Sequence, residues 1–540
     1  MHIRGPLSTT IARSAAVALA TAIAIVGGTP GASTAGRPAP ELVNAGFEDI
    51  TDLAAPVGWT ETGDRDASYV EPGGRTGDQR LSHWADTGYR VQTRQQVTGL
   101  ARGTYTLRAA VRSSGGQRAA YLGVSGCGGG PAQRVDLPRT GDEWWVELAL
   151  TVRVTAGRCT VSVVSDAAAG QWANVDDVTF TRSDGSEGLP VAIGGADVSH
   201  LTKNEAHGAV YRDARGHPRD ALRILADNGV NYARLKVWVD PADGFSDKAD
   251  VLAKAKRVTA QGMKLMIDFH YSDTWADPGK QYKPAAWAEL GFDLLRQAVY
   301  DHTYEVVSAL RRQGTPPELV QVGNEVNGGM LWPDGRWDDW PGLAQLLTAG
   351  STAVTDASPR SKVVLHLAEG GNNGGHRWWF DNAVAYGVPF DVIAVSHYTY
   401  WHGPLGYLQA NLFDLTARYG RPVLVAETAY GFTLDEQDHE TNIFTATLAA
   451  EGGYPATPQG QADALRDIVN VVAAVPGGQG LGVIYWEPTW TAVDGAGWDP
   501  ADPTSGDGWE NQALFDYSGT ALPGLRVFAD AVAGDKGGKR

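Results

Sequence analysis

The feature that most constrains the fold of this sequence is an alternation of short apolar segments with helix-length segments, repeated eight times in the second part of the chain. The predicted strands are residues 193–198, 232–239, 264–269, 320–323, 363–367, 392–395, 422–426 and 482–486. Two of the segments between them, 218–228 and 249–261, are predicted helices, each followed by a glycine that ends it. Eight strand–helix units predict a (β/α)8 barrel over residues 191–531. A doubly wound open sheet is the alternative, but no glycine-rich phosphate-binding loop follows the first strand.

The first part of the chain has a different period. Apolar residues alternate with polar or small ones in segments such as 105–111 and 146–154, and glycine-rich turns separate these segments. Several short strands without helices between them predict an all-β sandwich over residues 41–181. Residues 182–190 are polar, contain Gly, Ser and Pro, and are the predicted linker, while residues 532–540 are a polar tail.

The N-terminus has the composition of an export signal, which we place at residues 1–35. Arg4 and Arg13 supply positive charge, residues 15–26 are apolar, and the small residues at 33–35 suit cleavage. A retained membrane anchor is the alternative, but this run is short for a membrane span, and no later segment reaches about 18 apolar residues. We therefore expect a secreted, extracellular protein whose mature form has no membrane attachment.

Charge and cysteine content restrict the possible partners. Asp and Glu outnumber Lys and Arg by 62 to 45, and the net charge of −17 argues against nucleic acid or anionic lipid as a partner. Both cysteines, Cys127 and Cys159, lie in the predicted sandwich, where export would allow them to form a disulfide. Two free buried thiols are the alternative.

Tryptophan is unusually abundant, with 18 residues against 12 phenylalanines. Thirteen of the 18 lie in the predicted barrel, and several stand where strands end, a position that core packing explains poorly. Sugar rings stack on flat aromatic side chains, so this excess is typical of a polysaccharide cleft. The tryptophans at strand ends are Trp238, Trp275, Trp401, Trp486 and Trp490.

Two glutamates follow strands of the predicted barrel, at the end where barrel enzymes collect their chemistry. They are Glu325 in VGNEVN and Glu427 in VLVAETAY. Glycoside hydrolysis needs such a pair, one to protonate the leaving oxygen and one to attack or to activate water. Asn324 is suited to holding a sugar hydroxyl, and Arg234 and Tyr398 are suited to keeping one glutamate ionised. The alternative is that each glutamate is only a solvated helix cap.

Histidines near strand ends raise the question of a catalytic metal. A barrel hydrolase can hold zinc with such a cluster, but the first strand lacks a His-x-His pair. We therefore expect no cofactor for catalysis and interpret these residues as neutral hydrogen-bonding groups around a sugar. They are His200, His270, His366, His397 and His402.

Several strings extend this pattern over nearly all of the second part of the chain. They are GADVS (195–199), RLKVW (234–238), DFHYSDTWADPGKQ (268–281), QVGNEVN (321–327), LHLAEGGN (365–372), SHYTYW (396–401), VAETAY (425–430), YWEPTW (485–490) and WENQALFD (509–516). Together they resemble glycoside hydrolase family 53, the endo-β-1,4-galactanases, within a clan of retaining barrel enzymes. One departure is Thr399, where the family often has proline.

The resemblance implies endo-hydrolysis of β-1,4-galactan, a pectin side chain, with retention of configuration. It makes Glu325 the general acid/base and Glu427 the nucleophile, with carboxyl groups about 5–5.5 Å apart. The implied substrate-binding residues are Arg234, Asp268, His270, Asn324, His397, Tyr398 and Trp486, with Trp486 forming a floor under the sugar. We expect a monomer. A mannanase or xylanase of the same clan, or a galactan-binding protein without activity, are the alternatives.

Bacterial members of the family often hold calcium in the loop after the seventh strand, which here reads LDEQDHETN (434–442). Calcium prefers carboxylate and carbonyl oxygens. The resemblance makes Asp435, Asp438, His439 and Asn442 the candidate ligands of a structural Ca²⁺. A solvated acidic loop is the alternative.

The sandwich resembles carbohydrate-binding modules of the jelly-roll type, and those of family 61, which bind galactan, are the natural comparison. The resemblance is carried by NAGFE (44–48), GWT (58–60) and WANVDDVTF (172–180). It makes Trp84, Tyr89, Trp144 and Trp172 candidate stacking platforms, of which we favour Trp84 and Trp172 for sugar binding. Some of these rings are alternatively core residues.

Overall fold

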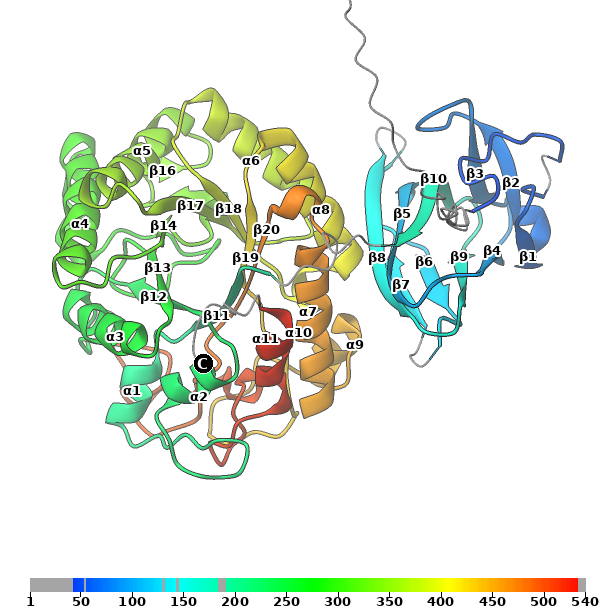
Figure 1. Cartoon of the computed structure of the whole chain (residues 1–540). Coiled ribbons are helices and arrows are strands. Elements are labelled where there is room, and N and C mark those ends of the chain that lie inside the picture. Colours follow the sequence, from blue (N-terminus) through cyan, green and yellow to red (C-terminus); the bar gives the residue numbers. More distant parts are fainter. Residues whose placement is uncertain (1–41, 53–54, 129–131, 142–144, 183–190, 533–540) are drawn as a thin grey trace, which may run out of the picture. The chain divides into compact units, whose positions relative to one another are not determined.

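The computed structural model describes residues 42–532 apart from 53–54, 129–131, 142–144 and 183–190. The predicted leader, Trp144, and nearly all of the predicted linker and tail lie outside the described residues. Figure 1 shows an all-β part followed in the chain by a ring of strands enclosed by helices.

The all-β part is a sandwich of two five-stranded antiparallel sheets, which confirms the predicted class. One sheet has the order β1-β4-β9-β6-β7 and the other β2-β3-β10-β5-β8. The strands are β1 (Thr60–Gly63), β2 (Ser68–Pro72), β3 (Gln79–Trp84), β4 (Tyr89–Thr98), β5 (Gly103–Ser113), β6 (Ala119–Ser125), β7 (Gln133–Asp136), β8 (Val146–Val154), β9 (Arg158–Ala167) and β10 (Trp172–Arg182). Alternate side chains such as Leu107, Val111 and Leu148 are buried between the sheets, as the period of two predicts.

Three sequence predictions in the sandwich can be compared with the structure. Cys127 and Cys159 form a disulfide. Trp84 and Trp172 are cross-strand neighbours on β3 and β10, and Trp84 is 42% exposed. Tyr89, by contrast, is buried, and its hydroxyl donates to the His83 and Gln171 carbonyls, so it is a core residue and not a platform.

The second part is a closed barrel of eight parallel strands, as predicted. Their order is β11-β12-β13-β14-β17-β18-β19-β20. Their bounds are β11 (Ile193–Asp197), β12 (Tyr232–Val237), β13 (Lys264–Phe269), β14 (Leu319–Val322), β17 (Lys362–Leu367), β18 (Val392–Ser396), β19 (Val423–Glu427) and β20 (Gly480–Tyr485). A small hairpin, β15 (Gly329–Met330) with β16 (Gly335–Arg336), follows β14.

Helices surround the barrel (Figure 1). They are α1 (Leu201–Ala206), α2 (Ala221–Asp227), α3 (Lys248–Ala260), α4 (Phe292–Arg312), α5 (Trp340–Ala357), α6 (Asn373–Ala385), α7 (Thr399–His402), α8 (Leu405–Tyr419), α9 (Ala446–Gly452), α10 (Pro458–Ala473) and α11 (Arg526–Ala531). Aspartate side chains cap the first two predicted helices, since Asp220 accepts from the Arg223 amide and Asp247 from the Asp250 amide. Among the described residues, no helix is long and apolar enough to cross a membrane.

The barrel interior explains where polar side chains gather. An apolar layer that includes Tyr232, Met266, Leu319, Val364 and Ala394 packs together inside the barrel. Side chains two residues further along a strand point to the same side, nearer its carboxyl end. Those positions are all polar: Arg234, Asp268, Gln321, His366 and Ser396. The strand period therefore places a polar layer directly above the apolar layer.

Candidate active site

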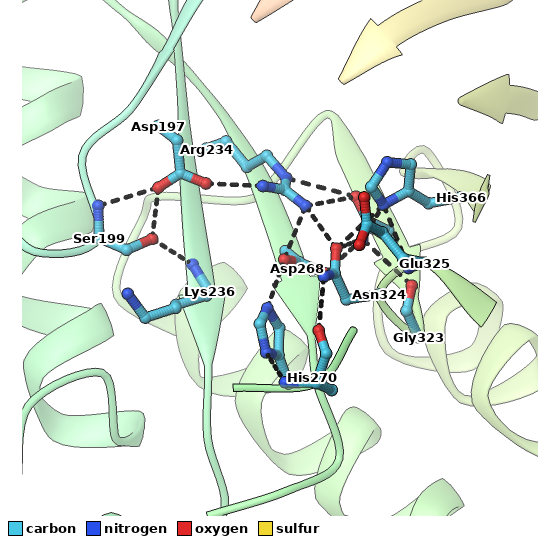
Figure 2. A network of polar contacts seen from close by, with 12 residues as sticks. Asp197, Ser199, Arg234, Lys236, Asp268, His270, Gly323, Asn324, Glu325 and His366 are labelled. Carbon is cyan, nitrogen blue, oxygen red and sulfur yellow. Dashed lines mark hydrogen bonds and ion pairs between the residues drawn. The ribbon is translucent and has the colours of Figure 1, made fainter. Parts of the chain in front are cut away.

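A buried guanidinium lies at the centre of this polar layer. Arg234 is 1% exposed and forms ion pairs of 2.8 Å with Asp197, Asp268 and Glu427. It also donates to Asn324 Oδ1 at 2.9 Å (Figure 2). A further hydrogen bond of 3.2 Å joins it to Gln321 Oε1. A guanidinium has five donors in a rigid plane, so one side chain can orient several acceptors at once.

Glu427 is held at both carboxylate oxygens. Oε1 pairs with Arg234, and Oε2 accepts a hydrogen bond of 3.1 Å from the Tyr398 hydroxyl. Both contacts stabilise the charged form of this carboxyl group and fix its orientation. Two of the residues predicted to support a glutamate, Arg234 and Tyr398, thus contact the same one.

Glu325 has a different environment. Its backbone is left-handed, with φ 48°, just after Gly323 at φ 84°, and such a conformation costs about 1–3 kcal/mol in a non-glycine residue. Its Oε1 accepts a 2.6 Å hydrogen bond from Ser396, whose Oγ also lies 2.9 Å from His366 Nε2. One oxygen of Glu325 and one of Glu427 lie within 4.8 Å of each other.

The two glutamates differ in their affinity for a proton. Burial and the nearby Glu427 raise the pKa of Glu325 well above its usual value. Burial also raises the pKa of Glu427, to about 7, but Arg234 and the Tyr398 hydroxyl act in the opposite direction. Glu325 is therefore suited to carrying a proton and Glu427 to being the carboxylate.

Both glutamates line a cleft of about 570 Å³. Aromatic side chains form much of its wall: Tyr398, Trp275, Trp401, Trp486, Trp490, Trp498 and Trp509. The remaining lining residues include Asn324, His270 and Glu369. A cleft with flat apolar walls and two carboxyl groups on its surface can bind a sugar chain by stacking and act on a bond between two sugars.

Not every predicted substrate-binding residue faces this cleft. Asn324 lines it, and its Nδ2 donates to the Ala276 carbonyl at 2.8 Å, leaving a second amide hydrogen for a ligand. The His270 ring lines it, but both nitrogens bond within the protein, Nε2 to Asp268 and Nδ1 to the Ala276 amide. Asp268 is fully buried beneath Arg234 and His270 and supports the site from below.

His397 also lies away from the cleft. It is fully buried, and burial lowers the pKa of its ring to about 3, so the ring is neutral. Its backbone amide donates to the Glu427 carbonyl at 2.8 Å. Its contact with the site is therefore through the backbone.

Some site residues were not predicted from the sequence. Gln321 bonds Arg234, Asp268 and Asn324, and its position two residues after an interior leucine is the signal that identifies it. Trp498 and Trp509 line the cleft from the long segment after β20. The expectation that functional residues follow the ends of barrel strands does not identify residues so far from a strand.

Among the described residues, Glu325, His366 and Glu427 are the one set of three acidic or imidazole side chains with an atom each within 4.8 Å of the others. The two nitrogens of His366 are already engaged, Nδ1 with Asn324 Oδ1 and Nε2 with Ser396 Oγ, both at 3.0 Å or less. The geometry therefore fits a hydrogen-bonded catalytic pair better than a metal centre.

Comparison with known proteins identifies the family of this barrel. The model of "Glycosyl hydrolase family 53" matches residues 193–528. The chain belongs to glycosyl hydrolase family 53. The residues matched by the family model thus include the whole polar layer and both glutamates.

Individual relatives in the family agree with this assignment. The endo-beta-1,4-galactanase of Bacillus subtilis is 36% identical, covering 63% of this chain and 86% of that protein. The arabinogalactan endo-beta-1,4-galactanase of Thermothelomyces thermophilus is 34% identical, covering 62% of this chain and 98% of that protein. The solved family 53 catalytic domain of Ignisphaera aggregans is 43% identical, with a TM-score of 0.62, and covers 64% of this chain and 98% of that one.

Replacing Arg234 by lysine tests the role of the guanidinium. Lysine keeps the charge but loses the planar donors, so we expect kcat/KM to fall by about 10²–10³-fold. The Glu427 carboxylate would lose stabilisation and its pKa would rise, which moves the acid limb of the kcat/KM profile to higher pH. Arg257→Lys, at a surface pair with Glu205, is the matched control and should change neither. An unshifted acid limb in Arg234→Lys would contradict this role.

Proposed function

We propose that this protein is a secreted endo-β-1,4-galactanase that cleaves its substrate with retention of configuration. The observation that carries the proposal is the pair Glu325 and Glu427, with oxygens within 4.8 Å in a cleft walled by tryptophan. Retaining glycosidases have carboxyl groups about 5–5.5 Å apart, and inverting ones about 6.5–9.5 Å. The galactanase names of the family relatives support galactan as the substrate. Secretion rests on the leader-like residues 1–35.

The proposed mechanism has two displacements. Glu427 attacks the anomeric carbon while Glu325 protonates the departing oxygen. The products are a galactosyl ester on Glu427 and a departing fragment with a free hydroxyl at its non-reducing end. Water then enters, Glu325 takes its proton, and the hydroxide displaces Glu427. Arg234 and Tyr398 stabilise the carboxylate of Glu427 before attack and after release. Asn324, which lines the cleft with both glutamates, would hold a sugar hydroxyl.

The activity is tested on a panel of purified polysaccharides, with new reducing ends and the first anomer formed as readouts. We expect release from β-1,4-galactan, with the β-anomer appearing first. Glu325→Gln and Glu427→Gln should each lose activity by at least about 10³-fold while remaining folded. Cleavage of mannan or xylan instead would assign a different activity of the same clan. Tight galactan binding without cleavage would make the protein a non-catalytic binder.

We further propose that the sandwich binds galactan through the face of the sheet that carries Trp84. Next to Trp84 and Trp172, Asn174 donates to Ser82 at 2.7 Å and accepts from Arg112 Nε at 3.1 Å. Flat rings beside ordered amide and guanidinium groups are the usual means of binding a neutral sugar.

The sandwich proposal is tested with the full chain carrying Glu427→Gln, so that the polymer is not degraded. Adding Trp84→Ala should lower retention of the protein on insoluble galactan, because an exposed stacking surface is lost. In the otherwise native chain, Trp84→Ala should leave hydrolysis of short galacto-oligosaccharides unchanged. Full retention after Trp84→Ala would place polymer binding elsewhere.

A structural calcium site is the last part of the proposal, with a ligand set that differs from the one expected from the loop alone. The predicted ligands Asp435 and His439 have exposed side chains. Asp438 and Asn442 instead lie with Asp507 and Glu510 from the segment after β20, through contacts such as Asp438 Oδ2 with the Asp507 amide at 2.7 Å.

Unpaired buried oxygens support this revised set. Asn442 Oδ1, Asp507 Oδ2 and Glu510 Oε2 are buried without a hydrogen-bond partner. Burial and the neighbouring acidic groups raise the pKa of Asp507 well above its usual value, and burial raises that of Glu510 to about 7. A hard dication with oxygen ligands would satisfy these atoms and link the two segments.

Removal of calcium tests the site. EDTA should lower the Tm of the native chain by several degrees, and excess Ca²⁺ should restore it, since a ligand bound only by the folded state stabilises that state. Asp507→Asn should weaken this response, while Asp435→Asn, which changes an exposed side chain, should preserve it. A Tm that is insensitive to EDTA in the native chain would contradict the site.

A further inference from the structure

A lysine that the proposed mechanism does not use is buried behind the tryptophan wall of the cleft. Lys236 lies two residues after Arg234 on β12, its amide donates to Ser199 Oγ (Figure 2), and its side chain is 2% exposed. Its Nζ lies 3.3 Å from Glu487 Oε1 and 3.4 Å from His200 Nδ1. A buried ammonium is costly unless its surroundings compensate for the lost water.

The side chains of Glu487 and His200 surround the Lys236 ammonium group and are themselves held by hydrogen bonds. Glu487 is fully buried, and both of its oxygens accept from the His200 amide at 3.2 Å. His200 Nε2 lies 3.3 Å from the Gly497 carbonyl, which places the ring proton there and leaves Nδ1 as an acceptor for Lys236. Burial lowers the pKa of His200 well below its usual value, so this ring is neutral.

The ammonium also faces an aromatic ring of the cleft. Lys236 Nζ lies 3.8 Å from the ring centroid of Trp275, within the range of a cation–π interaction. Trp275 is stacked on Trp490 at 5.7 Å, and Trp490 is stacked on His200 at 4.1 Å. Trp275 Nε1 donates to the Trp498 carbonyl at 2.7 Å, so the ring is held at its edge and at its face.

These rings belong to the wall that faces the catalytic pair. Trp275, Trp490 and Trp498 line the cleft together with Glu325 and Glu427, whereas Lys236 and Glu487 do not reach its surface. A bound sugar therefore contacts the rings and not the ion pair. A face-on cation restricts the tilt of an indole ring, and a stacking platform needs a defined tilt to match a sugar ring.

We propose that Lys236, paired with Glu487, is a positioning residue that fixes the orientation of Trp275 and thereby sets the affinity of the cleft for galactan. This inference rests on the galactanase activity proposed above. The competing explanation is that Lys236 only neutralises a buried carboxylate and that the rings pack equally well without it.

Three variants of the full chain separate these explanations: Lys236→Met, Glu487→Gln and the double variant. Lys236→Met leaves a buried carboxylate unpaired, so its Tm should fall, and the double variant should recover much of that loss because neither charge remains. Lys283→Met is the control, since the Lys283 side chain is 11% exposed and pairs with Asp334 at 2.6 Å. The control should lower the Tm and leave KM within about twofold.

The decisive readout is KM compared with kcat on β-1,4-galactan. In Lys236→Met and in the double variant we expect KM to rise about tenfold, as for a lost desolvated cation–π contact, with kcat within about twofold. If KM returns to the native value in the double variant, Lys236 only neutralises Glu487 and the proposal is overturned. A fall in kcat without a change in KM would also overturn it.

A second measurement remains informative if Lys236→Met folds poorly. In a Trp275→Ala background, the double change at Lys236 and Glu487 should raise KM no further, because the ring through which it acts is absent. Additive effects would contradict the coupling. The native chain is assayed first: if it releases no reducing ends from galactan, the proposed function fails, and the variants are then compared for galactan affinity by calorimetry.

Discussion

The architecture of the active site depends on one buried guanidinium. Arg234 is surrounded by Asp197, Asp268 and Glu427, three carboxylates against one positive charge. Burying that set without a cation would be prohibitive, and with it the carboxylates become fixed acceptors whose positions are mutually determined. Asp268 illustrates the balance, because burial alone would raise its pKa, yet Arg234 and His270 lower it overall.

This arrangement also produces the difference between the two glutamates of the cleft. The Glu427 carboxylate contacts Arg234 and Tyr398, while the Glu325 carboxyl group accepts from Ser396 and follows a left-handed backbone. The strain at Glu325 is tolerated because the strand before it and the polar residues around it hold the turn in place. Two identical side chains thus acquire different proton affinities from their surroundings, which is the requirement for acid and nucleophile roles in one cleft.

Much of this site could be predicted from local sequence, because a barrel strand has a simple geometry. The carboxyl ends of parallel strands meet at one face, so Glu325, Glu427, Arg234 and Tyr398 could be brought together without knowing any other contact. The local sequence predicts less well which of two neighbouring strand-end residues faces the cleft. His397 was predicted to bind substrate and is a buried neutral ring, because the burial of a single residue depends on neighbours distant in sequence.

Long loops set the limit of sequence-based prediction. The predicted calcium ligands all come from one acidic loop, whereas Asn442, Asp507 and Glu510, each with an unpaired buried oxygen, come from two segments. The tryptophan wall likewise combines Trp275 with Trp498, joined by a hydrogen bond across 223 positions of the chain. Which loops lie against each other is decided by packing, and no periodic pattern in the sequence predicts it.

Arg234 favours the ionised form of Glu427, while Glu325 holds a proton. Carbon-13 NMR of the glutamate carboxyl groups over a pH titration tests it most directly, with Glu325→Gln and Glu427→Gln used to assign the two signals. We expect Glu427 to lose its proton at the lower pH and Glu325 to remain protonated beyond that point. Ionisation of Glu325 before Glu427 would contradict it.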